Sequence, residues 1–245
     1  MNHASQSIDP GVIQNMKPGS IRAVHPTVAY AASVEWPRSY VVWDLETSGL
    51  EPTKDHILEI GAIVIHDGEV VSEHQWILDN GIEIKPELTA IHGIDNAMVA
   101  AEGRDPKQCM EEFMQVLQPG NLPNITHNGY KFDIPWLKHH ATVLLQLPEE
   151  QSDLLLRELH KSMIDTAALM KGALLQKPRG YNESMKDYAA RIMNIMAKGV
   201  YYKVPVCCEL LDIDMTGITT HRAGGDVVLT NEIYKKVAFP LYVTA

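Results

Sequence analysis

The sequence of 245 residues predicts an α/β domain built on a mixed sheet. Two observations support this prediction. Apolar segments rich in β-branched residues dominate the chain between residues 40 and 77, as is typical of neighbouring strands. Beyond residue 105, stretches with helical spacing alternate with short strand-like segments, and this alternation indicates a sheet covered by helices.

Three antiparallel strands are expected first. Tyr40–Trp43 is an apolar run of the buried-strand type that ends at Asp44, and residues 57–65 form a second such run. The Asp-Gly pair within residues 66–69 is a strong signal for a two-residue hairpin, which leads into a third strand over residues 70–77.

The remainder of the domain is predicted to alternate helices and short strands. Pro119 and Gly120 end the first helix, which Asp105 caps at its start. The predicted elements are a helix over 105–117, a strand over 122–126, helices over 132–147 and 149–160, a strand over 163–164, and helices over 167–175 and 226–237.

Length and composition favour one globular domain, expected over residues 39–245, preceded by an extended or disordered arm over residues 1–38 that is punctuated by proline. With 21 Lys and Arg against 31 Asp and Glu, the formal charge is −10. This acidity argues against a protein that coats long nucleic acids electrostatically.

The sequence predicts a cytoplasmic or otherwise intracellular protein without a membrane partner. The first residues lack a secretion signal, and no apolar run approaches the roughly 18 residues of a membrane span. Three cysteines, Cys109, Cys207 and Cys208, show no zinc-ligand spacing and suit a reducing compartment.

Four acidic residues are candidate metal ligands. Asp44 and Glu46 leave the same face of a strand because one residue separates them, whereas Asp133 and Asp226 fall in the first turns of predicted helices. Carboxylates are the ligands that hard divalent cations prefer. The alternative is a set of solvated acids at strand and helix ends, where a helix dipole stabilises an acid by roughly 0.3–1 kcal/mol. The Gly-Gly dipeptide before Asp226 predicts a tight turn, which would place His221 and Asp226 over one cleft.

Three segments in this order resemble the motifs of the DnaQ-like, or DEDDh, 3′→5′ exonuclease superfamily. They are Asp44–Leu50, Asn128–Asp133 and His221–Asp226, and the resemblance extends from about Tyr40 to Val237. His221, in a position where a tyrosine marks another branch, points to the histidine branch. The resemblance implies an RNase H-like fold with a central mixed sheet, three antiparallel strands first, and helices on both faces.

The resemblance also implies a site with two Mg²⁺ or Mn²⁺ ions. Asp44 would bridge the two ions, Glu46 and Asp226 would complete the one that activates water, and Asp133 would support the other. His221 would deprotonate the attacking water, a task that suits an imidazole near neutral pH. The product would be a nucleoside 5′-monophosphate from the 3′ end.

Further residues are carried over by the resemblance as substrate contacts, each with a structural alternative. In the structural alternative, Leu50 and Phe132 are core residues, His92 ends a helix before Gly93, and Asn128 completes a turn. Asp165 either contacts the site or caps the helix that follows it. The expected substrate-binding residues are Thr47, Leu50, His92, Asn128 and Phe132.

A segment over about 176–203 departs from the family pattern as an insertion. Its interleaved basic and tyrosine residues suit a flap that guides a strand. The favoured alternative is a packed helical insertion, because six apolar residues have helical spacing: Met185, Tyr188, Ala189, Ile192, Ile195 and Met196.

The expected function is metal-dependent proofreading or end trimming from a single-stranded or frayed 3′ end of DNA, with a DNA polymerase or replication protein as a candidate partner. Two alternatives remain at this point. An exoribonuclease would use the same acids, because discrimination depends on contacts to the 2′-hydroxyl. A catalytically silent nucleic-acid- or polymerase-binding module would retain the fold alone. The oligomeric state is not predicted.

Overall fold

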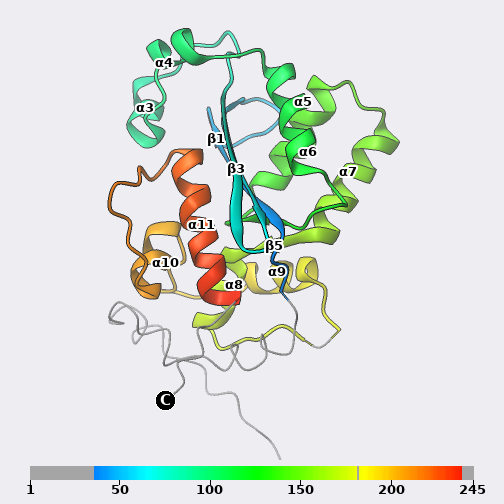
Figure 1. Ribbon diagram of the computed structural model, residues 1–245, viewed down its shortest axis with the longest axis vertical. Coiled ribbons are helices and arrows are strands. Elements are labelled where there is room, and N and C mark those ends of the chain that lie inside the picture. The colour runs from blue at the N-terminus through cyan, green and yellow to red at the C-terminus, as the bar shows by residue number, and fades with distance from the viewer. Residues whose placement is uncertain (1–35, 181, 239–245) are drawn as a thin grey trace, which may run out of the picture.

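The computed structural model describes residues 36–180 and 182–238 and shows an α/β fold around a mixed five-stranded sheet (Figure 1). The strand order is β3-β2-β1-β4-β5. The predicted fold class is confirmed, and the strands are β1 (Tyr40–Thr47), β2 (Ile57–His66), β3 (Glu69–Ile77), β4 (Asn124–Thr126) and β5 (Met163–Asp165).

The first three strands pair antiparallel, as expected. β2 and β3 are joined by Asp67 and Gly68, whose φ angles of 52° and 90° are both positive. A two-residue loop with this geometry matches the right-handed twist of the flanking strands, which explains the Asp-Gly pair. β1 extends to Thr47, so both Asp44 and Glu46 are strand residues.

The second half of the sheet is parallel. β4 pairs with β1 and β5 pairs with β4 in parallel registers. Between β4 and β5 the chain forms α6 (Asp133–Leu144) and α7 (Glu149–Ser162), so that the parallel strands are connected by a helical crossover.

Alternate residues of β1 pack into different layers of the core. Trp43 and Leu45 lie in a cluster with residues of α5 (Pro106–Leu117) and α6, whereas Tyr40 and Val42 pack with residues of α11 (Ala223–Ala238). Figure 1 shows α11 on one side of the strands and α5 with α6 on the other. Continuing the alternation places Asp44 and Glu46 on the α11 face of the sheet.

Helix α9 (Met185–Met193) lies within the predicted insertion and packs as expected. Tyr188, Ala189 and Ile192 are buried in the main core. Met196 follows the helix and is 97% exposed, so its assignment to the packed face was wrong. Two more helices flank α9 in sequence, α8 (Thr166–Leu174) and α10 (Val204–Leu211).

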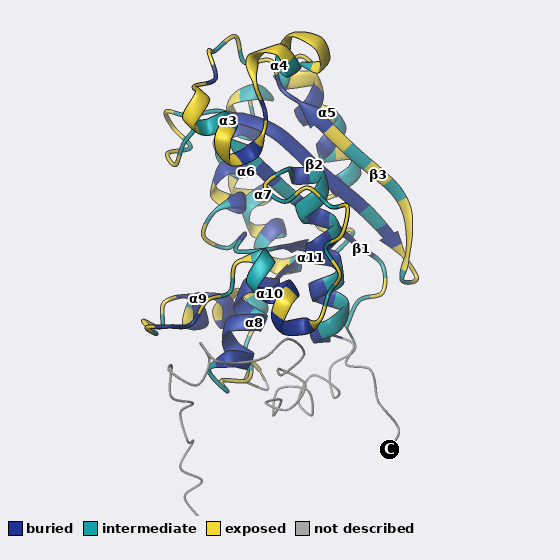
Figure 2. Ribbon diagram, turned by 90° about the vertical axis from the view of Figure 1, so that its left-hand side faces the viewer, coloured by how far each residue is buried: buried dark blue, intermediate teal, exposed yellow. Residues whose placement is uncertain are grey.

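Two short helices, α3 (Pro86–His92) and α4 (Asn96–Glu102), lie at one end of the fold and are largely exposed (Figure 2). α3 ends at His92 because Gly93 adopts a φ of 72°, as the structural alternative for His92 predicted. Among the described residues, no helix is long and apolar enough to cross a membrane.

Most of the predicted N-terminal arm, residues 1–35, lies outside the described residues. Its last residues pack on α11. The Trp36 ring makes an edge contact with Tyr234, whose hydroxyl donates to the Pro37 carbonyl at 3.0 Å. This contact positions the entry to β1.

Candidate active site

Three of the predicted metal ligands meet where β1 faces the start of α11. Carboxylate oxygens of Asp44, Glu46 and Asp226 all lie within 4.8 Å of one another. Asp44 and Glu46 continue the β1 face that packs on α11, and Asp226 stands in the first turn of that helix. The strand alternation therefore explains why residues from opposite ends of the domain sequence converge.

The close approach of α11 to the sheet depends on Gly61. This residue pairs with Asp44 across β1 and β2, and a Cβ added to it would lie 2.5 Å from the Ala223 carbonyl carbon. A side chain at position 61 would push the start of the helix away from the sheet, and Asp226 with it.

The Gly-Gly pair was expected to form a turn, and that prediction was wrong. Gly224 and Gly225 lie in the first turn of α11. A Cβ at Gly225 would meet the Thr219 carbonyl oxygen at 2.0 Å, so the glycine admits the preceding loop. The chain turns instead at His221, which adopts a φ of 58°.

Asp133 is the first residue of α6 and is buried. Asp165 holds the loop before it, because the two Asp165 carboxylate oxygens accept the Asn128 N–H at 3.0 Å and the Tyr130 N–H at 3.1 Å. Asp165 also accepts the Ala168 N–H and thereby caps α8. Asp165 thus positions the Asp133 loop from behind.

Burial raises the pKa of all four acids, and repulsion from neighbouring carboxylates raises it further. Burial is the largest cause throughout, and the pKa of Asp44 lies well above its usual value, with further contributions from Asp133 and Asp226. The pKa of Glu46 is raised to about 8 and that of Asp133 to about 8. Asp226 is raised less, to a pKa of about 6, because His221 lies nearby. A bound cation would remove this repulsion.

A fifth carboxylate, Glu59, lies beside the cluster but is fully paired. It stands opposite Glu46 in the register of β1 and β2, and its side chain has no exposed surface. Arg222 donates to it from Nε and Nη2, the latter at 2.7 Å, and Ala223 donates its N–H at 2.9 Å. Glu59 therefore anchors the segment between His221 and α11 to the sheet.

His221 is exposed and lies beside Asp226. Its backbone N–H donates to Asp226 Oδ2 at 3.2 Å. His221 and Asp226 both line a cavity of about 510 Å³, whose other walls are His127, Asn128 and residues 200–205. The imidazole thus borders both the acidic cluster and open space that a ligand can enter.

The expected substrate contacts have different environments. Leu50 is 83% exposed, which contradicts its core alternative, and Phe132 is half-buried against the main core. The Thr47 hydroxyl donates to the Gly49 carbonyl at 2.8 Å, and the buried His92 accepts the Ile94 N–H on Nδ1. Asn128 adopts a φ of 73° in its turn and also lines the cavity.

Glu59, Val204 and Pro205 were not expected at this site, whereas residues 200–203 belong to the segment for which a flap and a packed insertion were the two alternatives. A signal for Glu59 was available, because it is a charged residue within the continuous apolar run of β2, and a charge there requires a partner. Tyr201 and Tyr202 belonged to the pattern behind the flap alternative, but the position of the segment beside Asp226 depends on tertiary contacts such as that between His127 and Tyr202.

Structures of E. coli exonuclease I share this fold. One is a zinc-bound complex with single-stranded DNA, with a TM-score of 0.62 and 16% identity over 82% of this chain and 41% of that one. A complex with a dT13 oligonucleotide gives a TM-score of 0.61, with 16% identity over 83% of this chain and 42% of that one.

Two bacterial PolC-type DNA polymerase III proteins are similar in sequence. The one from Thermotoga petrophila is 32% identical over 162 residues, which cover 66% of this chain and 11% of that protein. The one from Caldanaerobacter subterraneus subsp. tengcongensis is 28% identical over 234 residues, 96% of this chain and 14% of that protein. The chain therefore spans only a small part of the length of these relatives.

The sequence model RNase_T, described as Exonuclease, matches residues 41–234. This range contains all three acidic motifs and nearly the whole sheet. The chain thus belongs to the exonuclease family, and the resemblance to the DnaQ-like superfamily is confirmed.

Proposed function

We propose that this protein is a metal-dependent 3′→5′ exonuclease that releases nucleoside 5′-monophosphates by two-metal-ion hydrolysis. The observation that carries the proposal is the convergence of Asp44, Glu46 and Asp226 within 4.8 Å, next to the buried Asp133. Carboxylates this close together repel one another and destabilise a fold when no basic side chain pairs with them. Bound cations would offset this repulsion.

The donor set fits Mg²⁺ or Mn²⁺. All four candidates are carboxylates, which suit hard cations, and Asp133 Oδ1 and Asp226 Oδ1 are buried without a hydrogen-bond partner among the described residues. Asp44, Glu46, Asp133 and Asp226 are the residues proposed to hold the ions. When bound, two such ions supply a nucleophilic water at neutral pH and neutralise charge on the phosphodiester.

The chain's own groups have defined parts in this proposal. His221 accepts a proton from the attacking water, which its exposed position at the cavity supports. Glu59, paired with Arg222, keeps His221 and the start of α11 against the sheet. Thr47 and Leu50 remain the residues proposed to contact the terminal sugar and base, and His92, Asn128 and Phe132 remain proposed as further substrate contacts.

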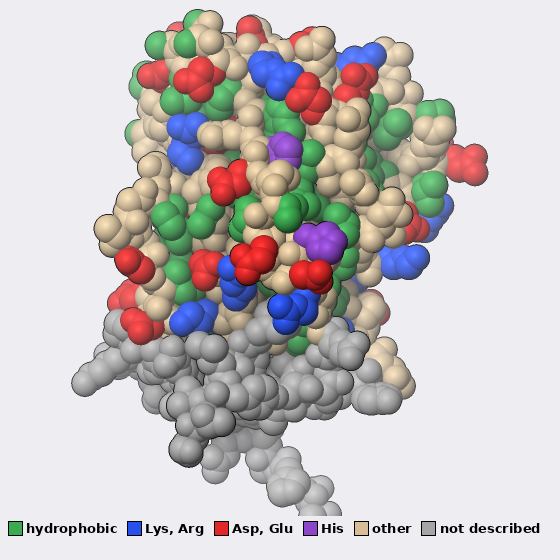
Figure 3. Space-filling model, in the orientation of Figure 1, with side chains coloured by type: hydrophobic (Ala, Val, Ile, Leu, Met, Phe, Trp, Pro, Cys, Tyr) green, Lys and Arg blue, Asp and Glu red, His purple; other side chains and the backbone are tan. Residues whose placement is uncertain are grey.

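DNA is the proposed substrate class. The sequence relatives are DNA polymerases, and the exonuclease I structures contain single-stranded DNA. A DNA polymerase is accordingly the proposed partner. Acidic and basic side chains are interspersed over the face that Figure 3 shows, without a continuous basic band, which favours grip on a strand end over coating of a long strand.

The test is a time course with 5′-labelled single-stranded DNA and the same sequence as RNA, each with Mg²⁺, Mn²⁺ or a chelator. A metal-dependent ladder that shortens from the 3′ end supports the proposal, and the faster substrate decides between DNA and RNA. Absence of degradation under all conditions would favour the silent binding module instead.

A further inference from the structure

The cavity beside His221 is lined by neither Thr47 nor Leu50, the two residues proposed to contact the terminal nucleotide. Of the other proposed substrate contacts, Asn128 lines it, whereas His92 and Phe132 do not. Its far wall is the segment over 200–205, and Asp226 forms part of its inner wall. Because His221 and Asp226 line the cavity while Thr47 and Leu50 do not, the cavity is the space beside the acidic cluster that is open to nucleotides upstream of the terminal one. The volume of about 510 Å³ falls in the range of roughly 300–1,000 Å³ typical of ligand sites.

The far wall is held in place by partly buried contacts. His127 donates from Nε2 to the Tyr202 carbonyl at 2.6 Å, and Cys207 Sγ lies 3.2 Å from the same oxygen. The Lys171 ammonium lies 5.2 Å from the centre of the Tyr202 ring and donates to the Ile195 carbonyl at 2.8 Å. Val200 is buried in a second apolar cluster.

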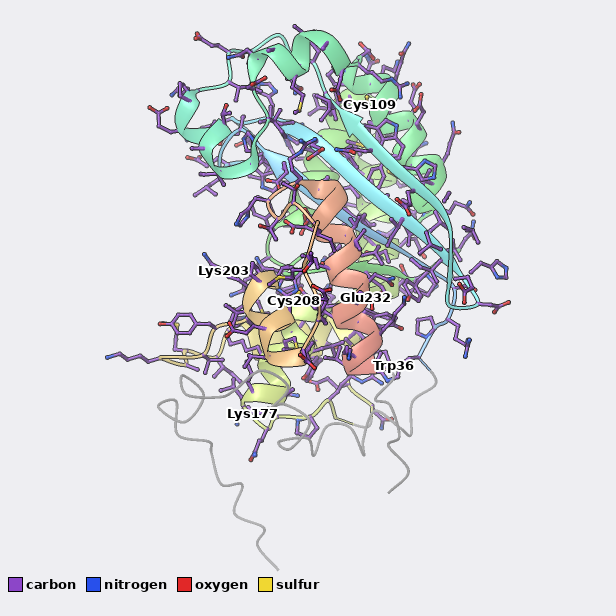
Figure 4. The ribbon with its side chains drawn as sticks, turned by 60° about the vertical axis from the view of Figure 1, so that its left-hand side comes forward. Trp36, Cys109, Lys177, Lys203, Cys208 and Glu232 are labelled. Carbon is purple, nitrogen blue, oxygen red and sulfur yellow. The ribbon has the colours of Figure 1, made fainter. Side chains whose placement is uncertain are left out.

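These anchors leave the intervening side chains exposed. Val200 is buried and Tyr202 is half-buried, whereas Tyr201 is 57% exposed and Lys203 is exposed. Figure 4 shows Lys203 at the start of α10. An exposed aromatic ring offers a flat face on which an unpaired base can stack, and a neighbouring lysine attracts an anion.

We propose that this wall binds the nucleotide on the 5′ side of the scissile phosphate, with its base stacked on Tyr201 and a backbone phosphate beside Lys203. The inference rests on the proposed exonuclease function and adds a requirement to it. A base that stacks on a protein ring is unpaired, so the substrate needs at least two unpaired nucleotides at its 3′ end. Aromatic stacking combined with basic residues is the usual way to bind single strands without sequence preference.

The test compares two substrates in Mg²⁺. Thymidine 5′-(4-nitrophenyl) phosphate has one nucleoside and no upstream nucleotide, so it reports on hydrolysis alone, whereas a thymidine oligonucleotide also occupies the wall. Tyr201→Ala is expected to raise KM for the oligonucleotide by roughly 5- to 150-fold, the range for the loss of one stack. Hydrolysis of the nitrophenyl ester should stay within about twofold of wild type, because a substitution that changes KM alone has removed binding and left the chemical step intact.

Matched variants sharpen this comparison. Tyr201→Phe keeps the ring and should retain the wild-type KM. Lys203→Ala should raise KM for the oligonucleotide in a salt-dependent manner, whereas Lys161→Ala, which removes another exposed lysine at the end of α7, should not. A set of duplexes with one, two or three unpaired 3′ nucleotides should show a rise in rate at two, and Tyr201→Ala should abolish that step.

The outcomes separate the two proposals. An unchanged oligonucleotide KM in Tyr201→Ala, or an equal loss on both substrates, overturns the binding wall while the exonuclease function stands. If the wild type hydrolyses neither substrate, the exonuclease proposal fails, and anisotropy of a fluorescent thymidine oligonucleotide in Ca²⁺ decides the wall separately. Binding that weakens in Tyr201→Ala but not in Tyr201→Phe then supports it, and equal binding by all three overturns it.

Discussion

Glu46 and Glu59 face each other across neighbouring strands, yet their surroundings differ completely. Glu59 is buried and accepts hydrogen bonds from Arg222, Gln75 and the Ala223 N–H. Glu46 lies among acids, and burial together with Asp226 raises its pKa to about 8. Glu59 thus stabilises the fold through its ion pair, whereas Glu46 on the neighbouring strand is repelled by other carboxylates. A bound cation would relieve this repulsion.

Removing the central acid should have the largest effect on activity. Asp44→Asn removes one charge from the acidic cluster of Asp44, Glu46 and Asp226. It is expected to lower turnover by at least about 10³-fold, since several kcal/mol of charge stabilisation is lost. Degradation of labelled single-stranded DNA measures this effect. Asp153→Asn, at an exposed pair with Lys138, should keep wild-type activity. Turnover by a purified Asp44→Asn protein at the wild-type rate would rule out the site.

Loss of the imidazole should follow in size. His221→Ala is expected to slow hydrolysis by roughly 10²–10⁴-fold, the range for a general base. Metal binding should persist because His221 is outside the carboxylate cluster. Single-turnover rates with DNA, measured alongside metal-induced stabilisation, test both parts. Equal rates in variant and wild type would remove His221 from the chemistry.

Breaking the ion pair between Glu59 and Arg222 should mainly affect stability. Glu59→Gln leaves the Arg222 charge without its partner, and we expect a loss of roughly 3 kcal/mol in the free energy of unfolding, the lower end for buried pairs because Arg222 keeps some solvent contact. Urea denaturation measures the loss. The control is Glu111→Gln, which removes a half-exposed pair with Lys107 and should cost at most about 0.5 kcal/mol. Similar losses in the two variants would contradict the buried pairing.

Divalent cations bound at the acidic cluster should stabilise the folded protein. At a concentration roughly 100 times the dissociation constant, Mg²⁺ or Mn²⁺ should add about 2.7 kcal/mol to the free energy of unfolding. Asp44→Asn should lose most of this gain, whereas Glu111→Gln should keep it. Thermal melts over a metal titration provide the measurement, and identical shifts in wild type and Asp44→Asn would place the bound cation elsewhere.

The pH dependence of stability without metal tests the raised pKa values of the acidic cluster. Folding raises the pKa of Glu46 and Asp133 to about 8, so the folded state binds more protons than the unfolded state between the ordinary carboxyl pKa and about 8. The contribution of these groups to stability therefore falls as pH rises through this window. Urea denaturation in chelator at about pH 5 and about pH 8 should show the decline, and Glu46→Gln should reduce it. An increase in their contribution over this range would contradict the raised pKa values.

The strand pattern predicted half of the site. One intervening residue sufficed to put Asp44 and Glu46 on one face, and the Asp-Gly pair fixed the hairpin beside them. The approach of Asp226 was not predictable in the same way, because it depends on the absence of a side chain at Gly61, which pairs with Asp44. Contacts between distant segments leave little trace in local periodicity.

The loop residues show the same division. Tyr188 and Ile192 followed helical spacing into the core, whereas Met196 shared the spacing but lay beyond the end of the helix. Tyr201 owes its exposure to the anchoring of Tyr202 by His127, a contact between residues 75 positions apart. Periodicity predicts which residues are buried within an element, but not where the element ends.

Asp165 also bears on how the molecule opens. Its carboxylate accepts the amide protons of Asn128, Tyr130 and Ala168, which belong to the loop before α6 and to the first turn of α8. Because one carboxylate accepts all three amides, neither segment can open alone without leaving this carboxylate partly unsatisfied. In hydrogen exchange the three amides should behave as one cooperative unit, so that the loop carrying Asp133 has the local stability of the helix behind it.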